Sequence, residues 1–424
     1  MAQAGRPWEL YSARHRWGLL AILYLVSTSN YLDRNILAVL LEPIRVEFAA
    51  SDTMLGLLSG LAFVIFYALF GIPVARWADV GNRRTIVTVA LTVWSLMTVA
   101  CGLAQTFVQL AIARVGVGAG ESGAIPPAQS LIAEYFPPEQ RASAIAIFTS
   151  ASTAGLLLGI GVGGYVATHY GWRTAFMVAG LPGLVLAVLV RFGLREPRLV
   201  LGFPRSGAQG ESLRAAIASL RAKPSFVLML IGAILYFLMA YGALLFVPTF
   251  LVRVHGLSLA VVGFSYAGVS AAGSLLGTLA GGWVADRLAR RDARWLAWLP
   301  ALTFVLGGLL FMAAFMLDSY SAFLVCAFVG MALMNVGVPA MFAAVHAVCG
   351  GPRRAMAIAI VLFSGTLFGG GLGPLLTGIV SDAFSASHGA GGLRYSLILM
   401  TSTALLAGAV FYHAGRAMPA DIEQ

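Results

Sequence analysis

The sequence carries little charge for its length. Only 10% of its 424 residues are Asp, Glu, Lys or Arg, whereas a soluble domain carries about 25%. Hydrophobic residues make up 59% of the chain, and the mean hydropathy is +0.88. The composition therefore excludes an ordinary soluble globular protein and indicates a membrane protein.

Cysteine is also scarce. The chain has three, Cys101, Cys326 and Cys349, and each lies in an apolar stretch, so they suggest neither a disulfide framework nor a metal cluster. The segment "GAGESG" (118–123) lacks the strand-then-helix context of a nucleotide-binding loop. Because no catalytic triad, metal cluster or phosphate loop is visible, we expect no enzyme activity and no cofactor.

The net charge is +10, from 27 Lys and Arg against 17 Asp and Glu. These cations stand in short clusters between apolar runs, not on one face of a soluble domain, so we exclude nucleic acid as a partner. Lysine occurs once, at Lys223, and this dominance of arginine favours a GC-rich bacterial genome.

Twelve apolar runs follow one another along the chain, each close to the ~20 residues that span a bilayer as a helix. We therefore predict an all-α membrane protein with 12 transmembrane helices in two pseudo-symmetric bundles. Residues 1–194 would form the first six-helix bundle, 195–223 a cytoplasmic linker, and 224–424 the second bundle. The runs lie at about 17–41, 53–75, 85–105, 107–130, 142–168, 174–194, 225–251, 259–285, 295–317, 320–346, 355–381 and 393–415.

The orientation follows from the positive charges. With the N-terminus inside, 21 of the 27 Lys and Arg residues fall in cytoplasmic segments and four in outer loops. This bias predicts that both termini are cytoplasmic. The first apolar run is too long for a signal peptide and no A-x-A-like cleavage site follows it, so we expect it to be a membrane anchor.

The two halves repeat each other. "WADVGNRR" (77–84) corresponds to "VADRLARR" (284–291), and "RASAIAIF" (141–148) corresponds to "RAMAIAIV" (354–361). Both pairs lie at predicted cytoplasmic helix ends and are separated by nearly half the chain. Such a duplication suits a transporter, in which two bundles rock about a central site.

These segments resemble the major facilitator superfamily, whose loop after the second helix reads G-x-x-x-D-R-x-G-R-R/K. The first copy here has Ala75 and Val80 at the Gly and Arg positions. "RVGVGAG" (114–120), "LGIGVGG" (158–164) and "GGGLGPLLTG" (369–378) resemble the family's patterns in helices 4, 5 and 11. The matching signature residues are Asp79, Arg83 and Arg84 in the first copy, and Gly282, Asp286, Arg287, Arg290 and Arg291 in the second.

Within the superfamily, "NYLDRN" (30–35), residues 51–79, residues 116–148 and "LREP" (194–197) resemble the spinster-type branch. Animal members of this branch move sphingosine phosphate and lysophospholipids. Symporters of sugar acids and related anions share an Asp-Arg pair in helix 1 and an Arg…Glu pair in helix 4, so the resemblance leaves both substrate classes open.

Four ionisable residues fall inside predicted membrane helices of the first half: Asp33, Arg34, Arg114 and Glu121. Arg114 and Glu121 are seven residues apart, which places them on one helix face about 10.5 Å apart along the axis. The depths of Asp33 and Arg114 coincide, which predicts an acid–base layer. We assign Arg34 and Arg114 to binding an anionic substrate, and Asp33 and Glu121 to proton coupling. Alternatively, the charges only neutralise each other and lock the bundle.

The second half has no equivalent acid. We name Tyr236 and Asn335 as candidate substrate contacts there, although helix packing is the favoured explanation of such residues. The family resemblance implies a cytoplasmic gate in which Asp79 pairs with Arg141 and Asp286 with Arg354; the alternative is charge that only sets topology. The gate candidates are Asp79, Arg83, Arg84, Arg141, Asp286, Arg290 and Arg354.

These features predict a secondary active transporter that is proton-coupled and moves an anionic amphiphile, such as a lysophospholipid or a sphingosine-phosphate-like lipid. One alternative is a proton-coupled symporter of an organic or sugar acid. Another is a transport-inactive membrane sensor. The four ionisable residues in the membrane helices argue against it, because a sensor would not need to keep them. The partners we expect are the substrate, protons and membrane lipids, and we expect a monomer in a bacterial inner membrane.

Overall fold

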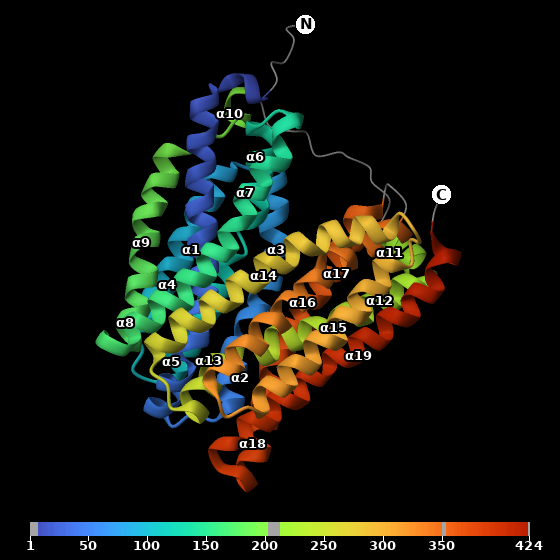
Figure 1. Ribbon diagram of the computed structural model, residues 1–424. Coiled ribbons are helices and arrows are strands. Elements are labelled where there is room, and N and C mark those ends of the chain that lie inside the picture. Colours follow the sequence, from blue (N-terminus) through green and yellow to red (C-terminus); the bar gives the residue numbers. More distant parts are fainter. Residues whose placement is uncertain (1–6, 202–212, 350–352, 423–424) are drawn as a thin grey trace, which may run out of the picture. The chain divides into compact units, whose positions relative to one another are not determined.

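The computed structural model describes residues 7–201, 213–349 and 353–422 (Figure 1). These residues form helices and short connections, with no strand among them. The chain divides into two compact units. Unit 1 comprises Met1–Phe48, Ala62–Ala208 and Ser258–Phe264, and unit 2 comprises Ala49–Leu61, Gln209–Leu257 and Ser265–Gln424. The predicted linker, 195–223, lies partly outside the described residues.

Unit 1 is built from long helices with polar caps. The side chain of Asn82 accepts a hydrogen bond from Thr85 N (3.1 Å) and so begins the fourth helix, and Thr106 does the same for Gln109 N (3.2 Å) at the fifth. The helices are α1 (Ala13–Phe48), α3 (Leu61–Val80), α4 (Arg83–Leu103), α5 (Phe107–Glu121), α6 (Ile125–Tyr135), α7 (Pro138–Leu156), α8 (Gly163–Tyr170), α9 (Trp172–Gly193) and the short α10 (Arg198–Leu201), preceded by a 3-10 turn, Pro7–Leu10.

The predicted helix 107–130 is interrupted. α5 ends at Glu121 and α6 begins at Ile125. Two prolines, Pro126 and Pro127, occupy the start of α6. Because proline has no backbone N–H and fits best in a first helical turn, it starts a new helix here and does not continue the old one.

Glycines of "RVGVGAG" bring α3 and α4 close to α5. A Cβ atom on Gly118 would lie 2.5 Å from the backbone oxygen of Phe63 on α3. A Cβ on Gly120 would lie 2.7 Å from the backbone nitrogen of Trp94 on α4. Small residues at such positions let membrane helices approach closely. The motif thus gathers three helices around the segment that carries Arg114 and Glu121.

Unit 2 contains one early segment of the chain. α2 (Asp52–Ser59) follows α1 in sequence, yet it packs against α18, where Gly56 faces the backbone of Pro374. The other helices are α11 (Leu213–Arg221), α12 (Pro224–Phe237), α13 (Leu244–His255), α14 (Leu259–Ala289, whose first six residues belong to unit 1), α15 (Trp295–Met316), α16 (Tyr320–Val348), α17 (Arg354–Ser364), α18 (Gly373–His388) and α19 (Gly392–Asp421), with a 3-10 turn at Gly389–Gly391.

A π-helical turn interrupts corresponding helices of the two units. In unit 1, η2 (Leu157–Val162) joins α7 to α8, and in unit 2, η5 (Gly365–Leu372) joins α17 to α18. These helices begin with the repeated "RASAIAIF" and "RAMAIAIV" segments. A third π-helical turn, η3 (Leu238–Ala243), joins α12 to α13. Such turns widen a helix locally and are frequent at functional sites.

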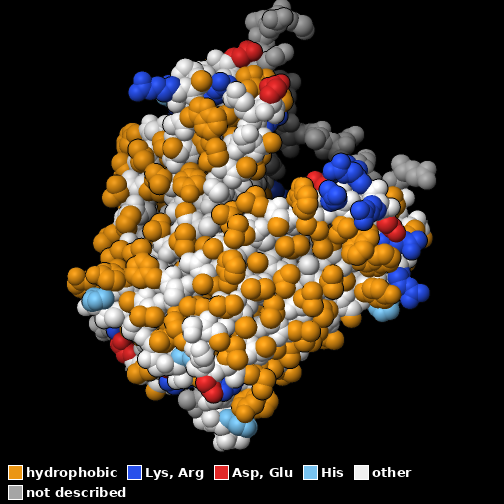
Figure 2. Space-filling view, in the orientation of Figure 1, with side chains coloured by type: hydrophobic (Ala, Val, Ile, Leu, Met, Phe, Trp, Pro, Cys, Tyr) orange, Lys and Arg blue, Asp and Glu red, His pale blue; other side chains and the backbone are white. Residues whose placement is uncertain are grey.

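Ten helical segments of the described residues are long and apolar enough to cross a membrane. On the face seen in Figure 2, hydrophobic side chains cover the sides of the helices, while charged side chains gather near helix ends. α1 and the α5–α6 pair are not among the ten, and they carry the four predicted buried charges. Together with the ten they account for twelve spans, so the predicted all-α membrane fold is confirmed.

Candidate functional site

Asp33 and Arg34, adjacent on α1, each face a different partner on α5. Arg34 Nε donates to Glu121 Oε2 at 2.6 Å, and Arg114 Nη1 lies 3.9 Å from Asp33 Oδ1. The structure therefore brings the four predicted ionisable residues into one cluster inside unit 1. The side chain of Arg34 is 28% exposed, whereas those of the other three are at most 3% exposed.

A hydroxyl on α4 completes the surroundings of Asp33. Thr98 Oγ1 donates to Asp33 Oδ2 at 2.8 Å and also contacts the backbone oxygen of Trp94 at 2.9 Å. Asp33 is thus held between α4 and α5. Sequence reasoning missed Thr98, for which the only signal was a hydroxyl within an apolar run.

Two aromatic rings of α3 border the guanidinium groups. The Arg34 guanidinium carbon lies 5.1 Å from the ring centroid of Phe63 and 4.6 Å from that of Tyr67. The Arg114 guanidinium carbon lies 5.5 Å from Phe63. Cations over aromatic faces at these distances are stabilised by the ring quadrupole. Phe63 therefore contacts both cations, a role that its position in an apolar run did not reveal.

The predicted substrate contacts of the second half lie in unit 2. Tyr236 is buried and its ring stacks on Phe304, with centroids 4.4 Å apart. Asn335 Nδ2 donates to Met331 O (2.9 Å) and to Ser274 Oγ (3.3 Å). Both residues thus have internal partners, as the packing alternative predicts.

Arg83, one of the gate candidates, is fully buried at the start of α4. Its guanidinium donates to both carboxylate oxygens of Glu134, each at 2.6 Å, and also to Glu196. Its backbone nitrogen donates to Glu196 Oε2 at 2.7 Å. Arg83 therefore joins the beginning of α4 to the end of α6 and the segment after α9, all within unit 1.

The other gate candidates of unit 1 have local contacts. Arg141 Nε donates to Phe136 O at 3.0 Å, and its guanidinium lies over Trp8. Arg84 lines a cavity of about 400 Å³ together with Tyr11. The side chain of Asp79 lies outside the described residues, so the predicted Asp79–Arg141 pair does too.

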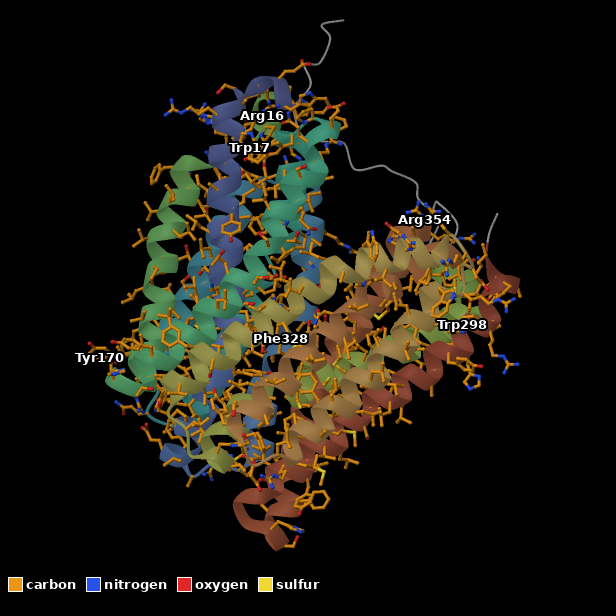
Figure 3. All side chains as sticks on the ribbon, in the orientation of Figure 1. Arg16, Trp17, Tyr170, Trp298, Phe328 and Arg354 are labelled. Carbon is orange, nitrogen blue, oxygen red and sulfur yellow. The ribbon has the colours of Figure 1, made fainter. Side chains whose placement is uncertain are left out.

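In unit 2, no ion pair joins Asp286 to Arg354 among the salt bridges of the described residues. Arg354, labelled in Figure 3, is exposed in the first turn of α17. Arg290 Nε instead donates to the backbone oxygen of Asp286 at 3.3 Å.

A second ionic cluster, which sequence reasoning missed, lies in unit 2 at the start of α2. Arg253 binds Asp52 through two parallel hydrogen bonds of 2.7 and 2.8 Å. Ser381 also donates to Asp52, and the carboxylate of Asp382 accepts from the backbone nitrogens of Asp52 and Thr53. The cluster therefore fixes α2 to α13 and α18.

No group of three or more His, Cys, Asp or Glu side chains suited to a metal ion occurs in the part of the chain that the structure describes. The residues assembled around Asp33 are instead acids, bases, a hydroxyl and aromatic rings. Such a set can bind an anion and exchange a proton.

Residues 23–312 match the family described as the Major Facilitator Superfamily. The chain belongs to this superfamily. It is 37% identical to an MFS-type efflux pump of Mycolicibacterium smegmatis, over 95% of this chain and 93% of that protein. It is also 28% identical to the hexuronate transporter of Bacillus subtilis, over 65% of this chain and 66% of that one.

Among solved structures, this MFS chain is similar to a bacterial homolog of the human lysosomal transporter Spinster, in an inward-facing and unoccupied conformation. The TM-score is 0.89 and the identity 30%, over 98% of this chain and 100% of the other. The spinster-like branch that the sequence motifs predicted is therefore confirmed, and the protein is a multi-pass MFS membrane transporter.

Proposed function

We propose that this transporter moves an anionic amphiphile, such as a lysophospholipid or a sphingosine-phosphate-like lipid, by proton-coupled alternating access. The observation that carries the proposal is the exposure of Arg34. Its side chain is 28% exposed, and the other three charged side chains of the cluster are nearly inaccessible. Nη2 of Arg34 is buried and has no partner among the described residues, so the guanidinium keeps a donor for an anionic group that enters over the exposed part of the side chain, and its fork of N–H donors suits phosphate and carboxylate.

Proton coupling follows from competition for Arg34. In the unliganded site Arg34 binds Glu121, whose side chain is fully buried. An anion that takes the guanidinium leaves Glu121 without its cation, and a buried carboxylate without a cation is stabilised by binding a proton. Substrate binding and proton uptake then occur together. Asp33 is the second acid, and Arg114 acts as its counter-ion and not as a substrate contact.

The aromatic rings beside Arg34 support an amphiphile. Phe63 and Tyr67 place apolar surface next to the cation that binds the head group, so a hydrocarbon chain leaving that head group meets an apolar wall. In unit 2, Tyr236 and Asn335 remain the proposed contacts for the rest of the substrate.

The charge pattern supports a bacterial inner membrane location with both termini in the cytoplasm. We keep Asp79, Arg84, Arg141, Asp286, Arg290 and Arg354 as a proposed cytoplasmic gate. Arg83 is buried between two carboxylates and is assigned to holding helix ends together.

The similarity to a protein named as an efflux pump supports export as the direction of transport.

A second candidate is proton-coupled symport of an organic or sugar acid. The similarity to a hexuronate transporter favours it, and a sugar carboxylate suits the Arg34 fork as well as a phosphate does. The two candidates share the coupling mechanism and differ only in what lies beyond the anionic group.

Transport by purified protein in liposomes separates the candidates. The wild type, under an imposed pH gradient, is offered a panel of lysophospholipids and a panel of sugar acids. We expect lysophospholipid movement that depends on the gradient, with at least a tenfold loss in Arg34→Gln. Arg45→Gln is the matched control, since Arg45 lies on the same helix and pairs with Glu42. Movement of sugar acids alone would replace the substrate class, and movement of neither would favour a sensor.

A further inference from the structure

Four buried side chains, Asp33 and three residues around it, carry hydrogen-bonding atoms without partners among the described residues. Asn30, on α1, is fully buried, and neither its Nδ2 nor its Oδ1 has a partner among the described residues. The same holds for Asp33 Oδ1, for Glu121 Oε1, and for Nε and Nη1 of Arg114. A buried polar group left unpaired destabilises the fold, and nearly all such groups in folded proteins have a partner, either protein or ordered water.

These atoms lie close enough to share one partner. Asn30 and Asp33 are three residues apart on α1, so they occupy one helix face, about 4.5 Å apart along the axis. Arg114 Nη1 and Asp33 Oδ1 are 3.9 Å apart, which is too long for a direct hydrogen bond. Polar groups separated by more than 3.5 Å are commonly bridged by water. A buried water needs two to four polar partners, and this face supplies them.

Two further unpaired hydroxyl groups lie on α1 and α4, both on the N-terminal side of the Asp33 cluster. Ser27, three residues before Asn30 on the same face of α1, is buried and its hydroxyl has no partner within the described ranges. On α4, Ser95 stands three residues before Thr98 and has the same properties. Both serines lie toward the N-terminal ends of their helices, which the charge pattern predicts to be cytoplasmic.

We infer that Asn30, Asp33 and Arg114 hold an internal water, and that Asn30 positions this water to carry protons between Asp33 and the Ser27–Ser95 side of the bundle. The inference rests on the proton coupling proposed above and adds a route to it. Protons reach Asp33 along α1 and α4 inside unit 1, whereas the substrate anion meets Arg34, the next residue of α1, where it pairs with Glu121. A sodium ion at the same place is disfavoured because Arg114 already supplies the positive charge.

The first test follows protonation without any substrate. Infrared spectra recorded after a pH jump report the protonated carboxyl band, which is assigned to Asp33 by its loss in Asp33→Asn. We expect Asn30→Leu, which keeps the number of side-chain heavy atoms and removes both polar atoms, to slow the appearance of this band at least tenfold. Asn35→Leu is the matched control on the same helix, because Asn35 is bonded to Tyr31 O.

The outcomes distinguish the inference from the proposed function. An unchanged rate in Asn30→Leu, with the band still assigned to Asp33, overturns the inference alone. A spectrum in which Asp33→Asn removes no band overturns the proton role of Asp33 itself. A band that responds to sodium chloride but not to potassium chloride would put a cation in place of the water and overturn the inference.

A second measurement does not depend on whether the variant folds. A map of the wild type at a resolution that shows ordered water should contain a peak within hydrogen-bonding distance of Asn30 and Asp33 Oδ1. A direct hydrogen bond between these side chains, or a closed Asp33–Arg114 pair with no peak, would overturn the inference.

Discussion

Arg34 and Glu121 are 87 residues apart in the sequence and meet through a hydrogen bond of 2.6 Å between Nε and Oε2. The two partners differ in exposure: the side chain of Arg34 is partly accessible, whereas that of Glu121 is fully buried. An anion can therefore reach the cation without first reaching the acid. This asymmetry is the basis of the exchange that we propose.

Glu121→Gln should separate binding from coupling. The variant keeps the size of the side chain and a hydrogen-bond acceptor for Arg34, but it cannot take up a proton. We expect exchange of substrate across the membrane to persist, because exchange needs no net proton movement, and gradient-driven accumulation to fall at least tenfold. Both are measured with the same proteoliposomes. Glu42→Gln on α1 is the control, and equal accumulation by Glu121→Gln and wild type would contradict the coupling mechanism.

Gly118→Ala should loosen the contact between α3 and α5. The added Cβ would lie 2.5 Å from the backbone oxygen of Phe63, so the helices must separate, at a cost of about 1–3 kcal/mol. We expect a lower thermal unfolding midpoint and weaker transport, since Phe63 borders both guanidinium groups. Gly268→Ala is the control, because a Cβ there meets nothing within 4 Å. Equal midpoints for the two variants would show that α5 tolerates the methyl group.

Arg83→Gln should destabilise the protein more than neutralising Arg83, Glu134 and Glu196 together. The single variant leaves Glu196 buried and without the Arg83 cation, and breaking a buried pair costs about 3–5 kcal/mol. The triple variant Arg83→Gln/Glu134→Gln/Glu196→Gln has no such charge and should recover part of the loss. Unfolding in increasing denaturant compares the two, with Arg84→Gln as the neighbouring control. A triple variant less stable than Arg83→Gln would contradict this account.

Glu47, at the C-terminal end of α1, should contribute to stability in a pH-dependent way. The hydrogen bond from Arg173 lowers the pKa of Glu47 below its usual value of 4.5, and a bond from Trp172 acts in the same direction. Because the folded pKa is depressed, this stabilisation is present above pH 4.5 and is lost as the pH falls through the folded pKa.

The pair is largely exposed, so the free energy involved is below about 1 kcal/mol. We expect the thermal midpoints of wild type and Glu47→Gln to differ at pH 7 and to converge as the pH is lowered below 4. A difference that persists unchanged in acid would assign it to packing and not to charge.

The membrane helices were largely predictable because apolar runs report them directly. The run predicted at 320–346 corresponds to α16 (Tyr320–Val348), and that at 295–317 to α15 (Trp295–Met316). The break between α5 and α6 was missed, although Pro126 and Pro127 signalled it. Hydropathy could not reveal that break, because the residues on both sides of it are apolar.

The candidate site was predictable in its members but not in its pairing. Helix rise placed Asp33 and Arg114 at one depth, yet which acid faces which base depends on the rotation of each helix about its axis. The rotation of α3 likewise turns Phe63 and Tyr67 toward the site, and that of α4 turns Thr98 toward it. The Asp52–Arg253 pair spans 201 residues. Asp52 lies in the first turn of α2, and Arg253 was predicted to lie in a loop, so no local sequence pattern connects the two residues.

α1 and the α5–α6 pair are missing from the ten segments that are long and apolar enough to cross a membrane, and their charges pair with each other. α1 leaves the ribosome before α5 and carries Asp33 and Arg34 before α5 has been synthesised. A charged residue in lipid is costly until it finds a partner. α1 should therefore remain near the translocon, or at the membrane surface, until about 80 residues later Arg114 and Glu121 arrive. The charges that we assign to transport would then also set the order in which the first bundle assembles in the membrane.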